Sequence, residues 1–193
     1  QSVALAGGLA WASGMRLYAV LFVAGLLGRL GYLQLPAALQ ILENPWVLGL
    51  AGVLLVIEFL ADKIPVVDSI WDSVQTFVRI PAGALLAALA LGEHDPALMV
   101  IAGLLGGTLT AGTHVAKAGS RALINTSPEP FSNIAASLGE DALVASGFMA
   151  AVFHPVVFLV LLGLFVVLLF WALPKVFRGV TKLRSAFSGL FGR

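Results

Sequence analysis

The chain contains no cysteine and few charged residues, which make up 11% of its 193 residues. Without cysteine it can form neither a disulfide bond nor a thiolate metal site, so the sequence does not indicate a redox compartment. The formal net charge of +1 is too small to suggest a nucleic-acid partner. The Gly-x-Ser-x-Gly, His-Glu-x-x-His and P-loop signatures are also missing, and we therefore expect neither an enzyme nor a bound cofactor.

Hydrophobic residues make up 60% of the chain, and its mean hydropathy is +1.01. Ordinary soluble domains contain roughly 45–50% apolar residues. The apolar runs at 45–61 and 155–174 come close to or reach the ~20 residues that a helix needs to cross a bilayer. The sequence therefore predicts an all-α protein, a polytopic transmembrane helical bundle in a lipid bilayer. Proline, glycine and charged residues divide it into six expected spans, at about 3–32, 45–63, 69–92, 96–124, 130–153 and 155–174.

The first expected span is too long for one simple crossing. It is interrupted at "ASGMRLY" (12–18), which predicts a broken first helix. Six spans also allow two inverted three-helix repeats, at 3–92 and 96–174. The stretch "GGLAWASGMRLY" (7–18) resembles "GGTLTAGTHVAK" (106–117), but matches this short also arise by chance in helices rich in Gly and Ala. The repeat and the chance likeness both stay open.

Lysine and arginine concentrate in segments that would share one face of the membrane. If residue 1 is cytoplasmic, that face holds Lys63, Arg79, Lys117, Arg121 and Lys175. Because cytoplasmic ends carry the excess of basic residues, we expect both termini to be cytoplasmic. The first 15 residues contain no Lys or Arg that could begin a signal peptide, so we expect them to belong to the mature fold.

The C-terminal segment 175–193 follows the transmembrane bundle of residues 1–174 and is expected to be a separate unit. Its apolar residues recur every three or four positions, with basic residues between them. This pattern predicts a basic amphipathic cytoplasmic tail that lies in the plane of the inner leaflet. A disordered basic tail is the alternative.

The stretch 58–79 contains six of the chain's charged side chains, although apolar runs flank it on both sides. Glu58 and Asp62 are four residues apart, so they lie on one helix face, and Asp68 and Asp72 repeat that spacing after Pro65. Asp62, Lys63, Asp68 and Arg79 individually suit helix caps or anchors at the membrane interface. Glu58 differs, since it lies inside an apolar run, where an ionised group costs ~2.5–3.5 kcal/mol unless it is paired or hydrated.

Other charged residues are expected at similar depth. Glu140 and Asp141 lie near the middle of the fifth span, and Arg16 lies beside the break in the first. His114, Lys117 and Arg121 form a basic stripe along one face of the fourth. An internal network of ion pairs, Arg16 with Glu140 or Asp141 and Lys117 with Glu58, is one interpretation. A substrate or ion pathway is the other, and it is the more usual role of charges at this depth.

The linker 125–133 is rich in residues that cap helices and form turns. Ser127 or Ser132 could cap the fifth span, which would account for the pattern by itself. Together with Asn133 and the nearby Lys117 and Arg121, the same groups could instead bind an anion such as a phosphate headgroup.

Four stretches together resemble a bacterial integral-membrane family, the domain of unknown function 4126 (DUF4126). They are "ASGMRLY", "EFLADKIPVVDSIWDSVQTFVR", "AKAGSRALINTSPEPFSN" and "GEDALVASG". The resemblance spans nearly the whole chain and implies a multi-helix protein of the bacterial inner membrane, without an activity or a substrate.

A weaker likeness concerns the string "EFLADK" (58–63), which is similar to the Glu-x-Gly-Asp-Lys/Arg signature of manganese and calcium cation/proton exchangers. Glu58, Asp62 and Lys63 would match that signature. The string has one extra residue and lacks the Gly, and Glu140 and Asp141 are not followed by a base.

We expect an inner-membrane transporter that carries a small ion, a divalent cation that competes with protons for the same carboxylates. The predicted metal ligands are Glu58, Asp62, Glu140 and Asp141, with Asp72 as a supplement. An anionic-lipid or organic-anion transporter that uses Arg16, His114, Lys117 and Arg121 is one alternative. A scaffold or complex subunit without transport activity is another. Besides the lipid bilayer and the transported ion or anion, the expected partners include no nucleic acid, and a homodimer is left open.

Overall fold

The computed structural model describes residues 1–91, 95–125 and 131–191. Within these ranges, side chains are described except at Pro65, Val176, Gly179, Val180 and 182–191. The described residues form seven helices and no strand, which confirms the predicted all-α bundle. In chain order the elements are α1 (Ser2–Arg29), the short 3-10 helix η1 (Ala37–Glu43), α2 (Pro45–Ala61), α3 (Pro65–Leu91), α4 (Pro96–Ile124), α5 (Phe131–Phe153) and α6 (Pro155–Phe191).

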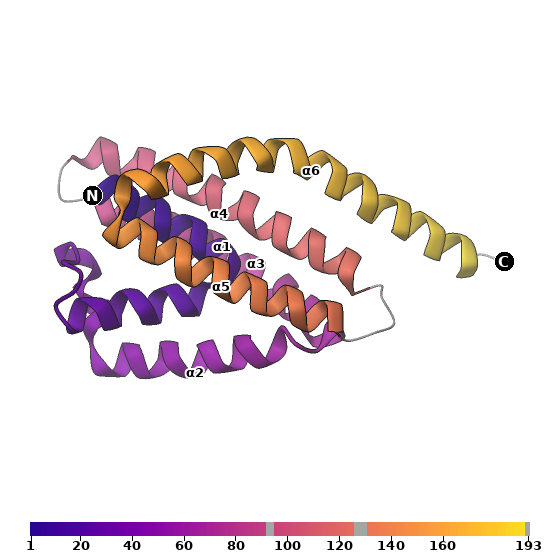
Figure 1. Cartoon of the computed structure of the whole chain (residues 1–193), viewed down its shortest axis with the longest axis horizontal. Coiled ribbons are helices and arrows are strands. Elements are labelled where there is room, and N and C mark those ends of the chain that lie inside the picture. The colour runs from indigo at the N-terminus through magenta and orange to yellow at the C-terminus, as the bar shows by residue number, and fades with distance from the viewer. Residues whose placement is uncertain (92–94, 126–130, 192–193) are drawn as a thin grey trace.

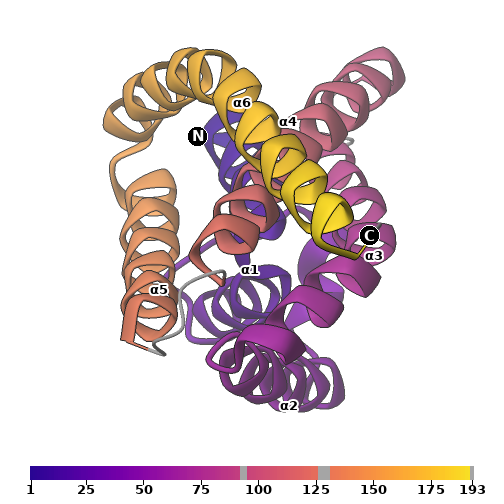
Figure 2. The ribbon, with the colours of Figure 1, turned by 90° about the vertical axis from the view of Figure 1, so that its right-hand side faces the viewer.

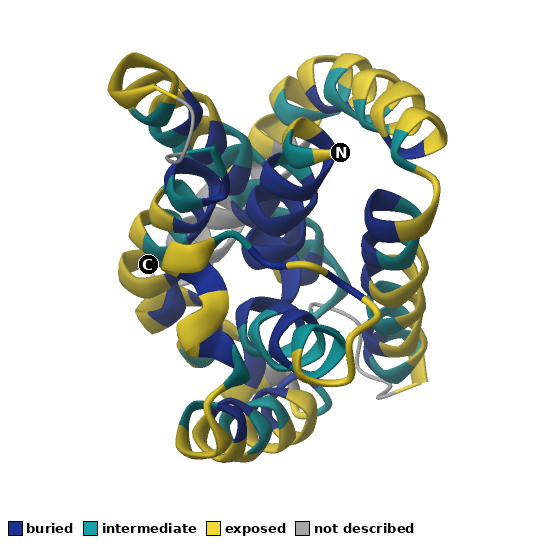
Figure 3. Cartoon of the chain, turned by 90° about the vertical axis from the view of Figure 1, so that its left-hand side faces the viewer, coloured by how far each residue is buried: buried dark blue, intermediate teal, exposed yellow. Residues whose placement is uncertain are grey.

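The lengths and compositions of the helices are those of a protein that crosses a membrane several times. Among the described residues, α1, α3, α4, α5 and α6 are long and apolar enough to span one. η1 and α2 meet at an angle of 67° and would together add a sixth span. The outer faces of the helices are exposed (Figure 3), and they carry large apolar side chains such as Trp46 and Phe77. Lipid tails are as apolar as these side chains, so such an exterior suits a bilayer.

Among the described residues, four helices begin at a proline. α2 and α4 begin at Pro45 and Pro96, where the Asn44 and Asp95 side chains accept hydrogen bonds from the backbone N–H two residues further on. A proline at the first helical position removes no helical hydrogen bond, because that N–H has no partner within the helix. α3 and α6 likewise begin at Pro65 and Pro155. α3 begins a few residues before the start that the sequence predicts.

α1 is broken at Arg16, as the sequence predicts. Arg16 has a φ of −145° and a ψ of 76°, far from helical values. The first half of α1 runs beside α4 in the same direction. The Thr110 hydroxyl donates a hydrogen bond to the carbonyl of Ala10, and further along both helices the Lys117 ammonium donates one to the carbonyl of Met15.

The second half of α1 runs back toward the end from which the first half started. It lies antiparallel to α2, since Phe22 contacts Gly52 and the later Gly25 contacts the earlier Leu48. α1 is therefore two half-helices joined at Arg16, both entering the bundle from the same end (Figure 1). Helices broken in this way are tolerated within a membrane only where protein or water surrounds the break.

The fold-back overturns the expectation that both termini share one face of the membrane. A straight helix of 28 residues would separate its ends by ~42 Å. Instead, Gln1 and Ser2 line a cavity together with residues 33–36, which follow α1, and with Ala90 near the end of α3. Figure 1 shows residue 1 at one end of the bundle and the end of α6 at the other. The reason is the backbone of Arg16, which returns α1 to the end of the bundle where it starts.

The two halves of α1 form the centre of the bundle, and α2 to α6 surround them (Figure 2). Small residues allow this close packing. At Gly14, a Cβ atom would lie 2.6 Å from the carbonyl oxygen of Thr110 and 2.7 Å from the Cβ of Thr113, so only glycine fits against α4 there. The main apolar core, which includes Leu9, Ala10 and Phe148, gathers around the first half of α1.

Two sequence predictions concern the repeat and the tail. Residues 7–18 contain the break in α1, whereas residues 106–117 lie in the uninterrupted α4, so the two similar stretches adopt different backbones. The repeats at 3–92 and 96–174 stay a prediction. α6 continues through Pro174 to Phe191 as one helix. The side chains from 182 onward lie outside the described residues, so the amphipathic face of the tail also stays a prediction.

Candidate functional site

Ionisable side chains gather at the point where the two halves of α1 meet, and we call this group the charge cluster. Its four cations come from α1, α3 and α4 and are at most 3% exposed. Its six carboxyl groups come from α2, the turn after α2, α3 and α5. The members are Arg16, Arg79, Lys117, Arg121, Glu58, Asp62, Asp68, Asp72, Glu140 and Asp141.

Arg16 holds the tip of α1 to α2 and α5. Its Nη1 lies 2.5 Å from Asp62 Oδ2, and its Nη2 lies 2.9 Å from Asp141 Oδ1. Nη2 also donates hydrogen bonds to the hydroxyl and the carbonyl of Ser137, at 3.0 and 3.2 Å. The predicted pairing of Arg16 with the acidic pair of α5 is therefore present, with Asp141 nearer than Glu140, which lies 3.9 Å away.

Lys117 lies between two aspartates rather than beside Glu58, so its predicted pairing with Glu58 is wrong. Its ammonium is 2.9 Å from Asp62 Oδ2 and 3.3 Å from Asp72 Oδ1, and it also donates to the Met15 carbonyl at 3.3 Å. That carbonyl belongs to the last turn of the first half of α1, where partial negative charge attracts a cation.

Arg79 takes the position beside Glu58 because α3 carries it to the same depth as the inner end of α2. Its guanidinium pairs with Glu58 through Nη2 and with Asp72 Oδ1 through Nη1, the latter at 2.9 Å. Nη1 also lies 3.3 Å from Nδ1 of His114, and Nε2 of His114 lies 2.7 Å from the Thr76 hydroxyl. The sequence predicts an interfacial anchor at Arg79, but this side chain is fully buried.

Arg121 links α4 to the start of α5. It donates to both carboxylate oxygens of Glu140, at 3.0 and 3.2 Å, and to the side chain and carbonyl of Asn133. Asn133 in turn donates to the backbone carbonyl of Asp62 at 3.1 Å. Asn133 therefore positions cluster members. Of the other residues predicted to bind an anion, Ser132 has a buried hydroxyl without a partner among the described residues, and Ser127 lies outside them.

The predicted metal ligands Glu58, Asp62, Glu140 and Asp141 are not brought together as a set, because Glu58, Glu140 and Asp141 are drawn to three different arginines. Among the described residues, the carboxylates that do converge are Asp62, Asp68 and Asp72, whose ligand oxygens all lie within 4.8 Å of one another. We call them the aspartate triad. Asp62 and Asp72 were candidates from the sequence, and Asp68 was missed because its place at a helix start is typical of a cap.

Several carboxylate oxygens in the charge cluster are buried without a hydrogen-bond partner among the described residues. In the aspartate triad they are Oδ1 of Asp62, Oδ1 of Asp68 and Oδ2 of Asp72. The triad residues are at most 3% exposed. A buried charged oxygen without a partner costs free energy, so a proton or a cation at these oxygens would stabilise the structure.

The chain belongs to the family described as domain of unknown function (DUF4126), whose model matches residues 3–175. No curated protein and no solved structure matches the chain. The DUF4126 match contains the whole charge cluster and ends at the start of the predicted tail.

Two cavities reach the charge cluster of this DUF4126 protein from different sides. One, of about 190 Å³, lies between α3 and α4 and is lined by polar groups that include Asp72, Thr76 and Arg121. The other, of about 60 Å³, lies between the second half of α1 and α5, with Arg16 and Asp141 in its wall and apolar side chains elsewhere. The salt bridges from Asp72 through Lys117, Asp62 and Arg16 to Asp141 join the two walls.

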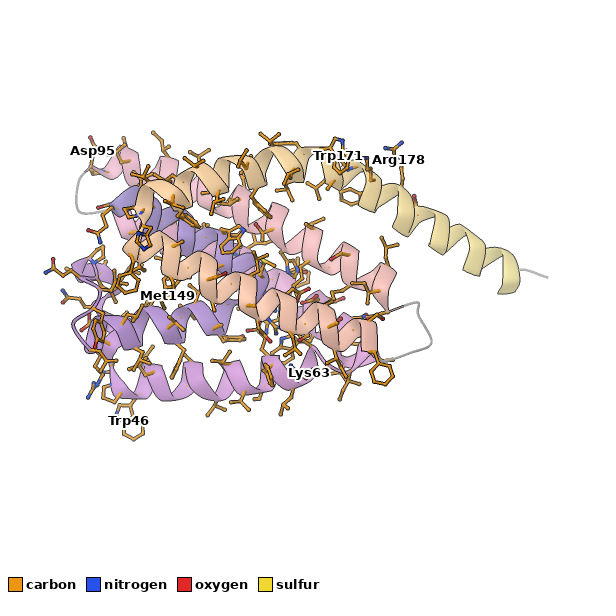
Figure 4. All side chains as sticks on the ribbon, in the orientation of Figure 1. Trp46, Lys63, Asp95, Met149, Trp171 and Arg178 are labelled. Atoms are coloured by element: carbon orange, nitrogen blue, oxygen red, sulfur yellow. The ribbon has the colours of Figure 1, made fainter. Side chains whose placement is uncertain are left out.

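Lys63 lies at the rim of the charge cluster, in the turn between α2 and α3 (Figure 4). Its ammonium donates to the Phe59 carbonyl at 3.1 Å and to the Ser137 hydroxyl at 3.4 Å, and it lies over the Phe59 ring. Burial lowers the pKa of Lys63, although the neighbouring Asp141 acts in the opposite direction. Lys63 therefore adds a fifth cationic side chain at the edge of the charge cluster, beside the four buried ones.

Proposed function

We propose that this DUF4126 protein is a membrane transporter that moves a small divalent cation in exchange for protons through the charge cluster. The observation that carries the proposal is an excess of acid in the charge cluster, whose members are buried except for the partly exposed Glu140 and Asp141. Six carboxyl groups face four cations, so the formal charge of the cluster is −2 when every member is ionised. In surroundings of low dielectric constant, such an excess has to be compensated by protons or by a bound cation.

One divalent cation or two protons would neutralise this excess. Lys63 at the rim contributes at most one positive charge. An excess of acid therefore remains whether or not Lys63 is counted with the charge cluster. Because the cation and the protons would use the same oxygens, each would displace the other. Competition of this kind couples the movement of a cation in one direction to that of protons in the other.

The surroundings of the cluster also suit transport. Cavities approach it from two sides, and the chain of salt bridges between them offers successive oxygens to a moving cation. The two half-helices of α1 end at the cluster, and broken helices of this kind often form ion sites in transporters.

The anion-transport alternative has less support. Arg16 and the two stripe residues Lys117 and Arg121 each contact at least one carboxylate, so a substrate anion would have to displace that carboxylate. The scaffold alternative requires that ion pairing alone accounts for the buried charges. The carboxylate oxygens without partners in the aspartate triad argue against it, since a purely structural network gains from complete pairing.

The test is flux through purified protein in liposomes, with a manganese-sensitive dye and a pH-sensitive dye inside. A gradient of Mn²⁺ should drive Mn²⁺ inward and protons outward. Asp72→Asn should abolish both fluxes. The variant should still fold, because Arg79 keeps Glu58 as a partner and Lys117 keeps Asp62. Asp95→Asn is the matched control, since Asn also caps a helix and Asp95 lies at the exposed start of α4.

The proposal would be overturned if liposomes that contain the wild-type protein took up no more Mn²⁺ or Ca²⁺ than empty liposomes do. If the same protein moved an anionic lipid in a manner that depends on Lys117 and Arg121, the anion alternative would replace it. Flux that Asp72→Asn leaves intact would place the pathway elsewhere in the protein.

A further inference from the structure

We infer that Asp62, Asp68 and Asp72 form a binding site for a divalent cation that prefers oxygen ligands, such as Ca²⁺ or Mn²⁺. The inference rests on the proposed function and deepens it, because it assigns the cation to one set of ligands. That set shares only Asp62 with the four metal ligands that the sequence predicts.

The geometry of the aspartate triad fits one cation. Its ligand oxygens lie within 4.8 Å of one another. Two oxygens on opposite sides of a Ca²⁺ ion, each at ~2.3–2.6 Å, are about 5 Å apart, so the three carboxylates can reach the same ion. The backbone holds them in place, since Asp62 ends α2, Asp68 lies in the first turn of α3 and Asp72 lies one turn further on.

The second observation is that each triad carboxylate keeps one oxygen available. Asp62 and Asp72 use one oxygen for cations and have no partner at the other, and Asp68 uses one oxygen to accept a hydrogen bond from Asn125 at 2.9 Å. Lys117 touches both Asp62 and Asp72, so it holds these two carboxylates in position. The neighbours therefore orient the triad without using all of its oxygens.

The cavity between α3 and α4 gives an ion access to this site. Asp72 lies in its wall together with Ser69, Ser73 and Thr76. Its volume of about 190 Å³ is enough for several water molecules. Divalent cations of this class commonly keep part of their water shell when they bind to protein oxygens.

Asp68 is the residue whose substitution tests the site most cleanly. Asp62 and Asp72 each contact buried cations, so their loss also disturbs ion pairs. Within the described part of the chain, no cation lies within ion-pairing distance of Asp68. In Asp68→Asn, the amide oxygen can still accept the hydrogen bond from Asn125, while the ligand charge is lost.

The experiment measures Mn²⁺ binding to the whole protein in detergent by the loss of the electron paramagnetic resonance signal of free Mn²⁺, with Ca²⁺ as competitor. Wild type should bind Mn²⁺, and Ca²⁺ should displace it. Asp68→Asn should weaken binding by at least about tenfold, since even residues that only orient metal ligands contribute 10- to 100-fold. Asp95→Asn, at the exposed start of α4, should bind as wild type does. Asp141→Asn tests one of the four ligands that the sequence predicts. Melting temperature and elution profile check the folding of each variant.

Wild-type protein that binds no Mn²⁺ at millimolar concentration, or Asp68→Asn that binds it unchanged, would overturn the site. Loss of binding in Asp141→Asn but not in Asp68→Asn would also overturn it and favour the ligands that the sequence predicts. Binding that depends on Asp68, in a protein that shows no flux in liposomes, would keep the site and remove the transport function.

Discussion

Two parts of one buried core are held together in different ways, although both are built around α1. Around the first half of α1, apolar residues such as Leu9 and Ala10 are fully buried. Ala10 lies close to Gly106 of α4, and Gly8 lies close to Ala151 of α5. The buried hydroxyl of Thr110 in this part donates to the carbonyls of Ala10 and Gly106. At the tip of α1, the contacts are instead between charged side chains.

The two parts differ in whether they retain atoms that could bind an ion. Close packing uses the surface that it buries, so the apolar part contributes stability and retains no capacity to bind an ion. The charge cluster also joins helices, but the aspartate triad keeps oxygens without partners. Ion pairs can therefore anchor the tip of α1 while the neighbouring aspartates keep oxygens that could bind a cation.

The largest effect should come from Arg16→Gln, which removes the charge that joins the tip of α1 to Asp62 and Asp141. Two carboxylates would lose a buried partner, and breaking such a pair costs ~3–5 kcal/mol. Thermal unfolding in detergent should show this loss. Arg29→Gln, at an exposed arginine that donates to the Glu43 carbonyl, is the control and should unfold close to the wild-type temperature. Equal stability of the two variants would show that the cluster does not anchor α1.

A smaller effect is expected in the packed region. Gly14→Ala would place a Cβ 2.6 Å from the Thr110 carbonyl oxygen, and overpacking of this kind costs ~1–3 kcal/mol. Gly139→Ala is matched to it, because a Cβ there meets nothing within 4 Å and alanine favours a helix by about 1 kcal/mol. The two variants should therefore change the unfolding temperature in opposite directions. If Gly14→Ala were neutral, the close contact of α1 with α4 would be in doubt.

The smallest effect should come from Lys63→Gln, which marks the outer limit of the charge cluster. Lys63 contributes hydrogen bonds and a contact with the Phe59 ring at a partly exposed position, worth ~0.5–1 kcal/mol. Both the unfolding temperature and the affinity for Mn²⁺ should stay near the wild-type values. A loss of affinity as large as that of Asp68→Asn would move Lys63 into the site.

Apolar runs and the proline, glycine and charged residues between them were enough to predict the six long helices and the break in α1, but not the short helix η1. They could not predict that α1 folds back, because "ASGMRLY" indicates a break but not the direction of the chain after it. The burial of Glu58 and Arg16 could also be predicted, since both residues interrupt apolar runs. Their partners depend on how the helices are rotated about their axes, and this is why Arg79 rather than Lys117 pairs with Glu58.

Asp68 shows a further limit of the sequence. An aspartate in the first turn of a helix favours a capping role, and only the packing of α2, α3 and α4 buries it beside Asp62 and Asp72. The repeated spacing of four residues from Asp68 to Asp72, directly after the turn that follows Asp62, was the signal available. This spacing indicates a group of acids around the turn. The predicted ligand set instead combined the acids that were expected at similar depth in the membrane, and it therefore left Asp68 out.

The most direct test of the central claim is the effect of membrane potential on Mn²⁺ uptake by liposomes that contain the purified protein. If one divalent cation exchanges for two protons, as the acid excess of the charge cluster implies, transport moves no net charge. An inside-negative potential of about 100 mV, worth ~2.3 kcal/mol for each uncompensated charge, should then leave the initial rate unchanged. Uptake that is absent, or that this potential clearly accelerates, would contradict the account.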